Sequence, residues 1–281
     1  MAIELATQFA PYTDELFKNE SKLTLLTNDD FDWTGAHTVR VYKISTGSMN
    51  DYDRLGTGEN WSSYGPVENL NATTQEMTLS RDRSFTFRID KLDTDETKMQ
   101  LQAATALARQ LREVVVPELD SYCYATMTAN AGHKPEAVTL TAENIYAEIL
   151  KASEALDDAE IPETNRVLLV PPSVYALMKQ SHDITLDSDV GQEMRLKGVT
   201  GILDGASVVK VPAVRLPKDF GFALVHPSAT VFPKKLEDYT VHQNPPGISG
   251  ALVEGRICYD CFTLDNKRAG IYYLAQPTGG K

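Results

Sequence analysis

The chain alternates polar and apolar positions with a period of two from Met77 to Ile89. Even-numbered positions from Thr78 to Asp90 are polar, while Phe85, Phe87 and Ile89 occupy odd positions. Because successive side chains of a strand point to opposite faces, this period is typical of a half-buried strand. We predict one long strand over 77–89.

The period changes to that of a helix directly after this strand. Asp93 and Glu96 have the spacing of a capping box. Apolar residues then recur every three or four positions, at Met99, Ala103, Leu107, Leu111 and Val114/Val115. Pro117 must kink or restart the helix, because proline lacks the N–H that an interior helical residue donates. We predict a spine helix over about 93–131, with Leu107 and Leu111 buried beneath it.

A second strand, Val39–Ile44, precedes a long polar segment that reaches about Thr73. Loops longer than roughly 12–15 residues are usually functional or disordered. This one carries Tyr52, Trp61 and Tyr64, which a disordered linker tends to lack. Since a two-stranded arm is not stable alone, we expect it to lie on another surface, and a neighbouring subunit is the obvious candidate.

The remainder of the chain predicts a compact α/β region and a return to strands. Apolar spacing predicts a helix through Ile145, Ile149, Ala152 and Leu156, and a buried strand over Val167–Val170. Ser173 is expected to cap the following helix. A short helix is expected around Thr13–Asn19. Further strands are expected at 206–211, 222–225, 230–232, 236–242, 255–263 and 269–274.

Candidate sites for chemistry are weak in this sequence. Cys258-x-x-Cys261 is a single pair of cysteines, whereas a zinc site needs four ligands. On a strand, residues three positions apart point to opposite faces, so the two sulfurs would also be separated. The five histidines are scattered, no G-x-S-x-G elbow is present, and the acidic clusters lack EF-hand spacing. We therefore assign no catalytic, cofactor-binding or metal-binding residue and predict that the protein is not an enzyme.

The charge and the apolar runs of the chain limit the classes of partner that it can bind. The 281 residues carry 39 acidic and 27 basic side chains, for a net charge of −12. Such a balance disfavours non-specific binding to nucleic acid, since phosphate contacts need clustered Lys and Arg. No apolar run approaches the length that spans a bilayer, so we expect no membrane partner.

Several short motifs occur in one consistent order along most of the chain. They are Asn19-Glu20-Ser21, Asp30-Phe31-x-x-Thr34-Gly35-Ala36, Asp51-Tyr52-Asp53-Arg54, Arg81-Asp82-Arg83-Ser84-Phe85, Ile89-Asp90-Lys91-Leu92-Asp93-x-Asp95-Glu96-Thr97, Val115-Val116-Pro117-Glu118-Leu119-Asp120-x-Tyr122 and Phe262-x-Leu264-Asp265-Asn266-Lys267-x-x-Gly270-Ile271-Tyr272. This series resembles major capsid proteins of tailed bacteriophages.

The resemblance implies an α+β chain with the Hong Kong-type phage capsid fold. Its blocks would be an N-terminal arm (1–35), an extended two-stranded loop (36–91) and a peripheral domain with the spine helix (92–135). An α/β axial domain (136–228) would follow. The segment 229–281 would then return to the peripheral domain as strands and a C-terminal tail.

The resemblance also implies a function and partners. The subunit would form pentamers and hexamers of an icosahedral shell around double-stranded phage DNA, without sequence-specific binding. Assembly would take place in the host bacterial cytoplasm, with separate scaffolding, portal and head–tail proteins. The shell of a cellular nanocompartment that holds a protein cargo is the alternative.

The extended loop is where we expect contacts between subunits. Asp51, Tyr52, Arg54, Trp61 and Tyr64 are the expected interface residues, because aromatic and Arg side chains dominate the energetics of most interfaces. Some members of the resembled family cross-link subunits through a lysine on this loop. No lysine lies between Lys43 and Lys91 here, so we expect no such cross-link.

Overall fold

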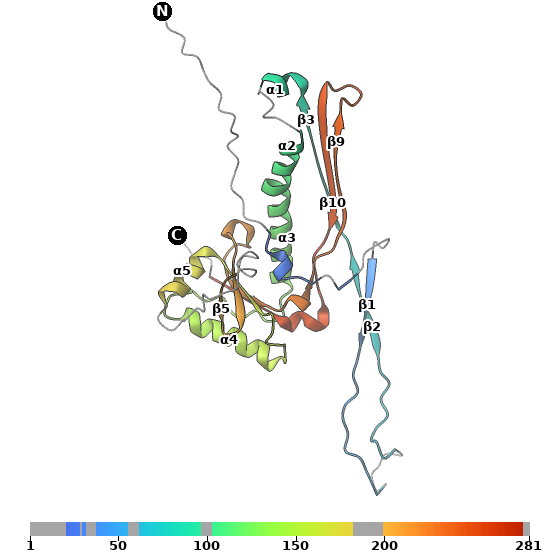
Figure 1. Cartoon of the computed structure of the whole chain (residues 1–281). Coiled ribbons are helices and arrows are strands. Elements are labelled where there is room, and N and C mark those ends of the chain that lie inside the picture. Colours follow the sequence, from blue (N-terminus) through green and yellow to red (C-terminus); the bar gives the residue numbers. More distant parts are fainter. Residues whose placement is uncertain are drawn as a thin grey trace, which may run out of the picture. The chain divides into compact units, whose positions relative to one another are not determined.

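A computed structural model describes residues 21–28, 30–31, 38–55, 62–96, 103–181 and 199–277. The chain divides into two compact units (Figure 1). Gly35–Leu79 form the smaller unit, and Met1–Thr34 together with Ser80–Lys281 form the larger. The expected short helix around Thr13–Asn19 lies outside the described residues.

The smaller unit is a two-stranded antiparallel arm. Strand β1 (Thr38–Ile44) pairs with β2 (Ala72–Thr78), from Thr38 opposite Thr78 to Ile44 opposite Ala72. Side chains along β1 alternate between exposed and half-buried. This narrow ribbon has only one strand pair to hold it, which is marginal for an isolated element in water.

The predicted long strand over 77–89 is wrong in one respect, because it is two strands. The first part is β2, and the second is β3 (Arg81–Asp90), which pairs with β10 (Gly250–Tyr259) in a different sheet. The interruption lies at Leu79–Ser80. The period of two continues across it because alternation reports which face a side chain occupies and carries no information about the pairing partner.

A three-stranded antiparallel sheet forms one side of the larger unit. Its order is β3-β10-β9, with β9 spanning Lys234–Gln243. Phe85 and Tyr239 lie on either side of Gly255 in this register. A Cβ at Gly255 would lie 2.3 Å from the Phe85 ring, so the glycine lets the aromatic ring cross the strand.

The spine is built from three helical segments that run beside this sheet (Figure 1). These are α2 (Ala103–Gln110), a π-helical turn (Leu111–Val115) and α3 (Val116–Ala129). Pro117 is in the first turn of α3, where its missing N–H costs least. The π-helical turn just before it accommodates the restart that the sequence predicts.

Two details of the predicted spine are wrong. A short helix, α1 (Lys91–Glu96), begins before Asp93, and the carboxylate of Asp90 accepts a hydrogen bond from the Leu92 N–H at 2.9 Å. Asp90 therefore takes the place expected for Asp93. Leu107 and Leu111 are half-buried rather than buried, since α2 and the π-helical turn contain no fully buried residue.

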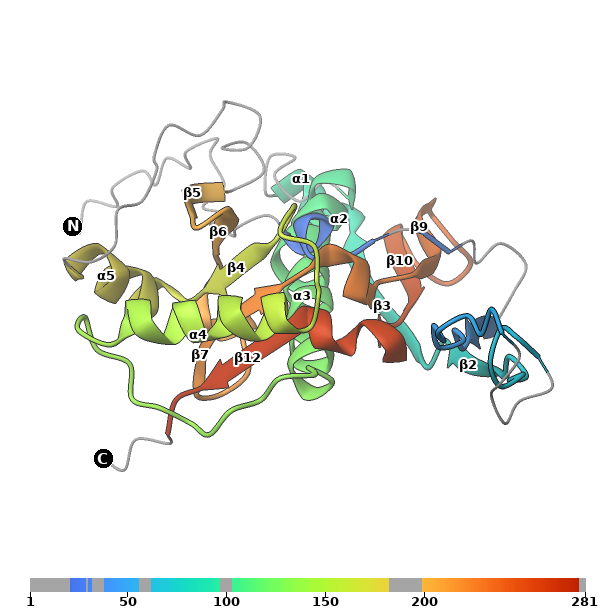
Figure 2. The ribbon, with the colours of Figure 1, turned by 90° about the horizontal axis from the view of Figure 1, so that it is seen from below.

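A five-stranded mixed sheet forms the other part of the larger unit. Its order is β12-β7-β4-β6-β5, and only β4 and β6 are parallel. The strands are β4 (Val167–Val170), β5 (Val199–Leu203), β6 (Ala206–Lys210), β7 (Phe220–Val225) and β12 (Ile271–Ala275). Figure 2 shows α4 (Ile145–Asp158) lying across these strands.

Apolar layers cover both faces of the five-stranded sheet. Leu168 and Val170 pack with α4 and α5 (Pro172–Gln180). Val167 and Leu169 pack on the opposite face with Cys123 and other residues of α3. Alternate residues of β4 therefore serve two cores, which explains why all four of its residues are buried.

Most expected elements of this region are confirmed. The helix through Ile145 and Leu156 is α4, and the buried strand is β4. Ser173 is not the cap of α5, because the helix already begins at Pro172. Short elements complete the chain: Leu23–Leu25, Ala213–Arg215, Pro227–Ala229 and Asp265–Gly270 are 3-10 helices, and β8 (Thr230–Val231) pairs with β11 (Phe262–Thr263).

Candidate subunit interface

The arm extends beyond its paired strands as two chain segments that still contact each other. Ser45 and Asn71 exchange hydrogen bonds, with the Ser45 N–H 3.0 Å from the Asn71 carbonyl oxygen. Farther out, the Asp53 N–H donates to the Ser63 carbonyl at 2.9 Å. These bonds hold the arm as a ribbon well past the end of β1 and β2.

Large apolar side chains are exposed along this ribbon. Among the described residues, twelve large hydrophobic side chains are exposed, and eight of them belong to the arm. Met49 is 98% exposed and Leu55 is 85% exposed. The eight are Tyr42, Ile44, Met49, Tyr52, Leu55, Tyr64, Val67 and Leu70. Exposed apolar side chains gathered on one element are typical of a surface that another molecule covers.

The structure places four of the five expected interface residues. Asp51, Tyr52, Arg54 and Tyr64 are all exposed on the arm, and Trp61 lies outside the described residues. The rings of Tyr52 and Tyr64 meet edge to face with their centres 5.0 Å apart. The two tyrosines therefore come from opposite sides of the ribbon and form a single aromatic pair.

Sequence reasoning missed the aliphatic part of this surface. The prediction named the aromatic residues of the polar loop together with Asp51 and Arg54, and it did not include Met49, Leu55, Val67 and Leu70. The signal was present, because an aliphatic residue in a segment rich in Gly, Asn, Ser and Asp has no nearby periodic pattern that would bury it.

The larger unit holds Ser80, its first residue after the arm, through a buried carboxylate. Asp260 Oδ2 accepts hydrogen bonds from the Ser80 N–H at 2.8 Å and from the Ser80 hydroxyl at 2.7 Å. Its other oxygen, Oδ1, accepts from the Tyr122 hydroxyl at 2.7 Å and from the Cys261 N–H at 2.8 Å. Arg81 lies 4.4 Å from the Tyr122 ring centre. Burial and Asp260 together raise the pKa of Tyr122.

A buried ion pair joins the spine to the region of the five-stranded sheet. Arg215 Nη1 lies 2.6 Å from Asp120 Oδ2, and both side chains are buried. The Ser21 hydroxyl donates to Asp120 Oδ1 at 2.6 Å. Burial raises the pKa of Asp120, and its bonds to Ser21 and Arg215 oppose that rise. The pair fastens α3 to the turn that follows β6.

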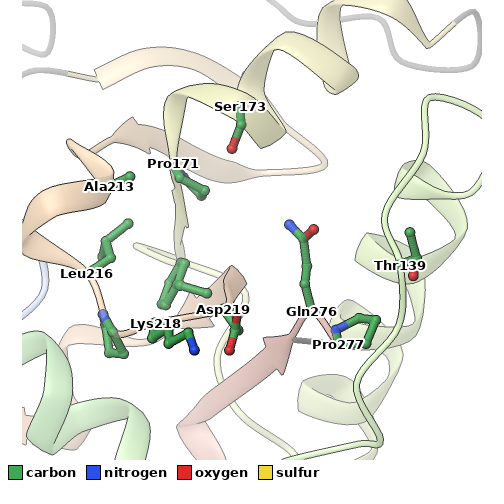
Figure 3. Close-up of a pocket in the computed structure, with 11 residues that line it drawn as sticks. Thr139, Pro171, Ser173, Ala213, Leu216, Lys218, Asp219, Gln276 and Pro277 are labelled. Atoms are coloured by element: carbon green, nitrogen blue, oxygen red, sulfur yellow. The ribbon is translucent and has the colours of Figure 1, made fainter. Parts of the chain in front are cut away.

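The larger unit also contains a cavity of about 520 Å³, shown in Figure 3. It lies where β4 ends and α5 begins, with Pro171 and Ser173 on one side and Gln276 on another. Lys218 and Asp219 are the ionisable residues of its lining. No histidine or cysteine lines this cavity.

No three His, Cys, Asp or Glu side chains among the described residues are placed to hold a metal ion. No helix in the described ranges is long and apolar enough to cross a membrane.

Comparison with known proteins decides the family. A family model described as phage capsid protein matches residues 73–272. The chain belongs to this phage capsid family. The match begins within β2 and ends in β12, so it includes the spine, the three-stranded sheet and most of the five-stranded sheet. No curated protein matches the sequence.

Solved structures of phage proteins share the fold. A protein of Mycobacterium phage Che8 has a TM-score of 0.75 at 16% identity, with 96% of each chain covered. The capsid of cyanophage P-SCSP1u gives 0.74 at 14% identity, covering 98% of this chain and 93% of its own. The mature capsid of bacteriophage PhiM1 gives 0.68 at 12% identity, covering 99% and 93%.

These findings confirm the predicted fold and family. The fold is of the Hong Kong type, and the chain is a structural major capsid protein of a tailed bacteriophage. It is therefore a component of the virion shell. The alternative of a cellular nanocompartment shell is not favoured, because the family model describes phage capsid proteins and the structures named above come from phages.

Proposed function

We propose that this capsid subunit assembles into pentamers and hexamers, which close into an icosahedral shell around double-stranded DNA. In this proposal the arm clasps a neighbouring subunit. Copies of one chain then occupy slightly different environments, and closure follows from symmetry. The role is structural and requires no catalytic step.

The observation that carries the proposal is the concentration of exposed apolar side chains on the arm. Eight of the twelve large exposed hydrophobic residues in the described part of the chain lie between Tyr42 and Leu70. A two-stranded ribbon cannot bury them against itself, since its described strands form a single layer. A neighbouring copy would remove this surface from water.

The chemistry of the arm supports a clasp with central anchors and a polar edge. The Tyr52–Tyr64 pair supplies rigid aromatic area, and Leu55 and Met49 add aliphatic area. Asp51 and Arg54 are exposed and charged, so they suit the rim of such a contact. Each contact can be of modest strength, because a subunit in a closed shell makes many of them at once.

We further propose how the shell is completed. Separate scaffolding, portal and head–tail proteins act with it, and assembly takes place in the host bacterial cytoplasm. The packaged DNA is held without sequence-specific binding. The net charge of −12 supports a wall that does not adhere to the packaged DNA, since contacts to phosphate groups need clustered Lys and Arg.

The test is to truncate the anchors of the arm. The double variant Tyr52→Ala/Tyr64→Ala should leave the subunit folded, because both side chains are exposed and contribute little to either core. Shells should be absent or should fall apart on dilution. Circular dichroism reports the fold, and negative-stain electron microscopy reports the shells.

A matched control keeps the result specific to the apolar surface. Glu68 and Asn69 lie on the same arm and are exposed, so Glu68→Ala/Asn69→Ala truncates two side chains there without removing aromatic area. This control should form normal shells. Robust shells from the tyrosine variant would remove the aromatic pair from the interface, and loss of its circular dichroism signal would place the pair in the fold.

A further inference from the structure

Two buried cysteines that are far apart in the sequence meet inside the larger unit. Cys123 is on α3, and Cys261 lies between β10 and β11. Their sulfur atoms are 3.2 Å apart, and both residues belong to the core shared by α3 and the five-stranded sheet. The third cysteine, Cys258, is half-buried. Nothing in the capsid function derived above uses this pair.

We propose that Cys123 and Cys261 are a disulfide-forming pair, reduced while the subunit folds and oxidised after the shell leaves the reducing interior of its host. The timing rests on the proposed function, because it assumes assembly in a host cytoplasm. The bond itself rests only on the geometry of the folded subunit.

The geometry favours this bond without unfolding. A disulfide has a sulfur–sulfur length near 2.05 Å, so the two atoms must approach by about 1 Å. The neighbouring residues already fix the two segments, because the Tyr122 hydroxyl donates to the Asp260 carboxylate at 2.7 Å. Tyr122 and Cys123 on one segment therefore face Asp260 and Cys261 on the other.

A peroxide is the class of oxidant that balances the reaction. The Cys261 sulfur attacks one oxygen of hydrogen peroxide, the O–O bond breaks, and the sulfenic acid and one water form. The Cys123 sulfur then attacks that sulfenic sulfur, the S–O bond breaks, and the Cys123 proton leaves with the hydroxide as a second water. Two thiols and one peroxide thus give one disulfide and two waters.

Burial makes the reaction slow and keeps the reduced form stable during assembly. Burial is the main cause that raises the pKa of the Cys123 thiol, and the Cys261 thiol adds to it. Since the thiolate is the reactive form, a thiol with a raised pKa reacts slowly. Reducing compartments also keep such thiols reduced.

The bond would fasten α3 to the segment that holds Ser80. Cys261 follows Asp260, whose carboxylate holds Ser80. The closed loop spans 138 residues, and long loops constrain the unfolded chain most. Oxidation should therefore raise the midpoint of thermal unfolding by roughly 5–15 °C.

Thiol counting tests the proposal on wild-type protein, both as free subunits and as purified particles. Samples are incubated with hydrogen peroxide or with a reductant, denatured, alkylated and analysed by peptide mass spectrometry. The three free thiols should fall to one, and the peptides that hold Cys123 and Cys261 should be joined with the loss of two hydrogen atoms. Differential scanning fluorimetry measures the shift in unfolding temperature.

Two variants make the result specific. In Cys258→Ser the two remaining thiols should fall to none and the same two peptides should be joined, whereas Cys123→Ser should give no joined peptides and no shift in unfolding temperature. Three free thiols after oxidation, sulfinic acid at Cys261, or a bond through Cys258 would each overturn the proposal. A bond in free subunits that never forms in shells would overturn its timing. Failure to form shells, seen by microscopy, would count against the proposed function and leave the bond standing.

Discussion

Two buried carboxylates, those of Asp120 and Asp260, bind side chains that are far away in the sequence. Asp120 meets Arg215 inside the molecule, and Asp260 gathers bonds from Ser80, Tyr122 and the Cys261 backbone. Each carboxylate is buried, so its partners compensate for the water it has lost. Removing one member of such a group leaves the others unpaired in a medium that solvates them poorly.

The Asp120–Arg215 pair gives a prediction at this scale. Asp120→Ala leaves the guanidinium of Arg215 buried without its carboxylate, so the free energy of unfolding should fall by about 3–5 kcal/mol. Urea unfolding of the unassembled subunit measures it. Arg256→Ala, which removes the exposed pair between Arg256 and Asp82, is the matched control and should change little. Equal effects in the two variants would mean that Asp120 is not the buried anchor described above.

The sequence can indicate which single residues are buried, but it cannot show which of them contact each other. Leu119, Cys123 and Met127 recur every fourth position along α3, as a buried helix face requires, and all three are buried. Arg215 pairs with a residue 95 positions away, and Cys261 meets one 138 positions away. Periodicity acts over a few turns of one element, whereas such contacts depend on how elements pack.

At the scale of elements, the spine changes character along its length. Leu111 lies in the π-helical turn and is half-buried, while Leu119 on α3 is buried among Cys123 and Ile257 in the core. A cavity of about 150 Å³, lined by Val115, Leu119 and Phe85, separates this part of the spine from the sheet. The packing is therefore tighter toward the end of α3 than near the π-helical turn.

This gradient predicts unequal costs for two equal truncations. Leu119→Ala should lower the free energy of unfolding by about 2–5 kcal/mol, because it empties a core position. Leu111→Ala should cost less, about 1–2 kcal/mol, since part of its apolar area is already in water. Thermal and urea unfolding of the two variants compare them directly. A cost at Leu111 equal to that at Leu119 would show that the first half of the spine is also packed in the subunit.

The elements also show where local patterns stop being informative. The helix α4 and the strand β4 were predicted because their periods are strong and uninterrupted. The break at Leu79–Ser80 was not, because both β2 and β3 keep one polar side and the alternation stays in phase. What changes there is the hydrogen-bonding partner, from β1 to β10, and no local pattern encodes it.

At the scale of the whole molecule, the arm and the larger unit differ in how far their apolar side chains are buried. The larger unit has two apolar cores on the faces of one sheet. The arm has a single strand pair and most of the large exposed hydrophobic side chains among the described residues. The proposed clasp would account for this asymmetry, because a neighbouring copy in the shell would cover the arm. The motifs identified the family, but the aliphatic half of the arm surface emerged only with the structure.

The most direct test of the central claim is electron cryomicroscopy of the purified protein, supported by light scattering over a range of concentrations. If the arm clasps a neighbouring subunit, we expect closed shells or rings of five and six subunits, with the segment around Tyr52 and Tyr64 in contact with a neighbouring copy. A stable monomer at high concentration in every condition tried would contradict it. Shells in which the arm touches no other subunit would also contradict it.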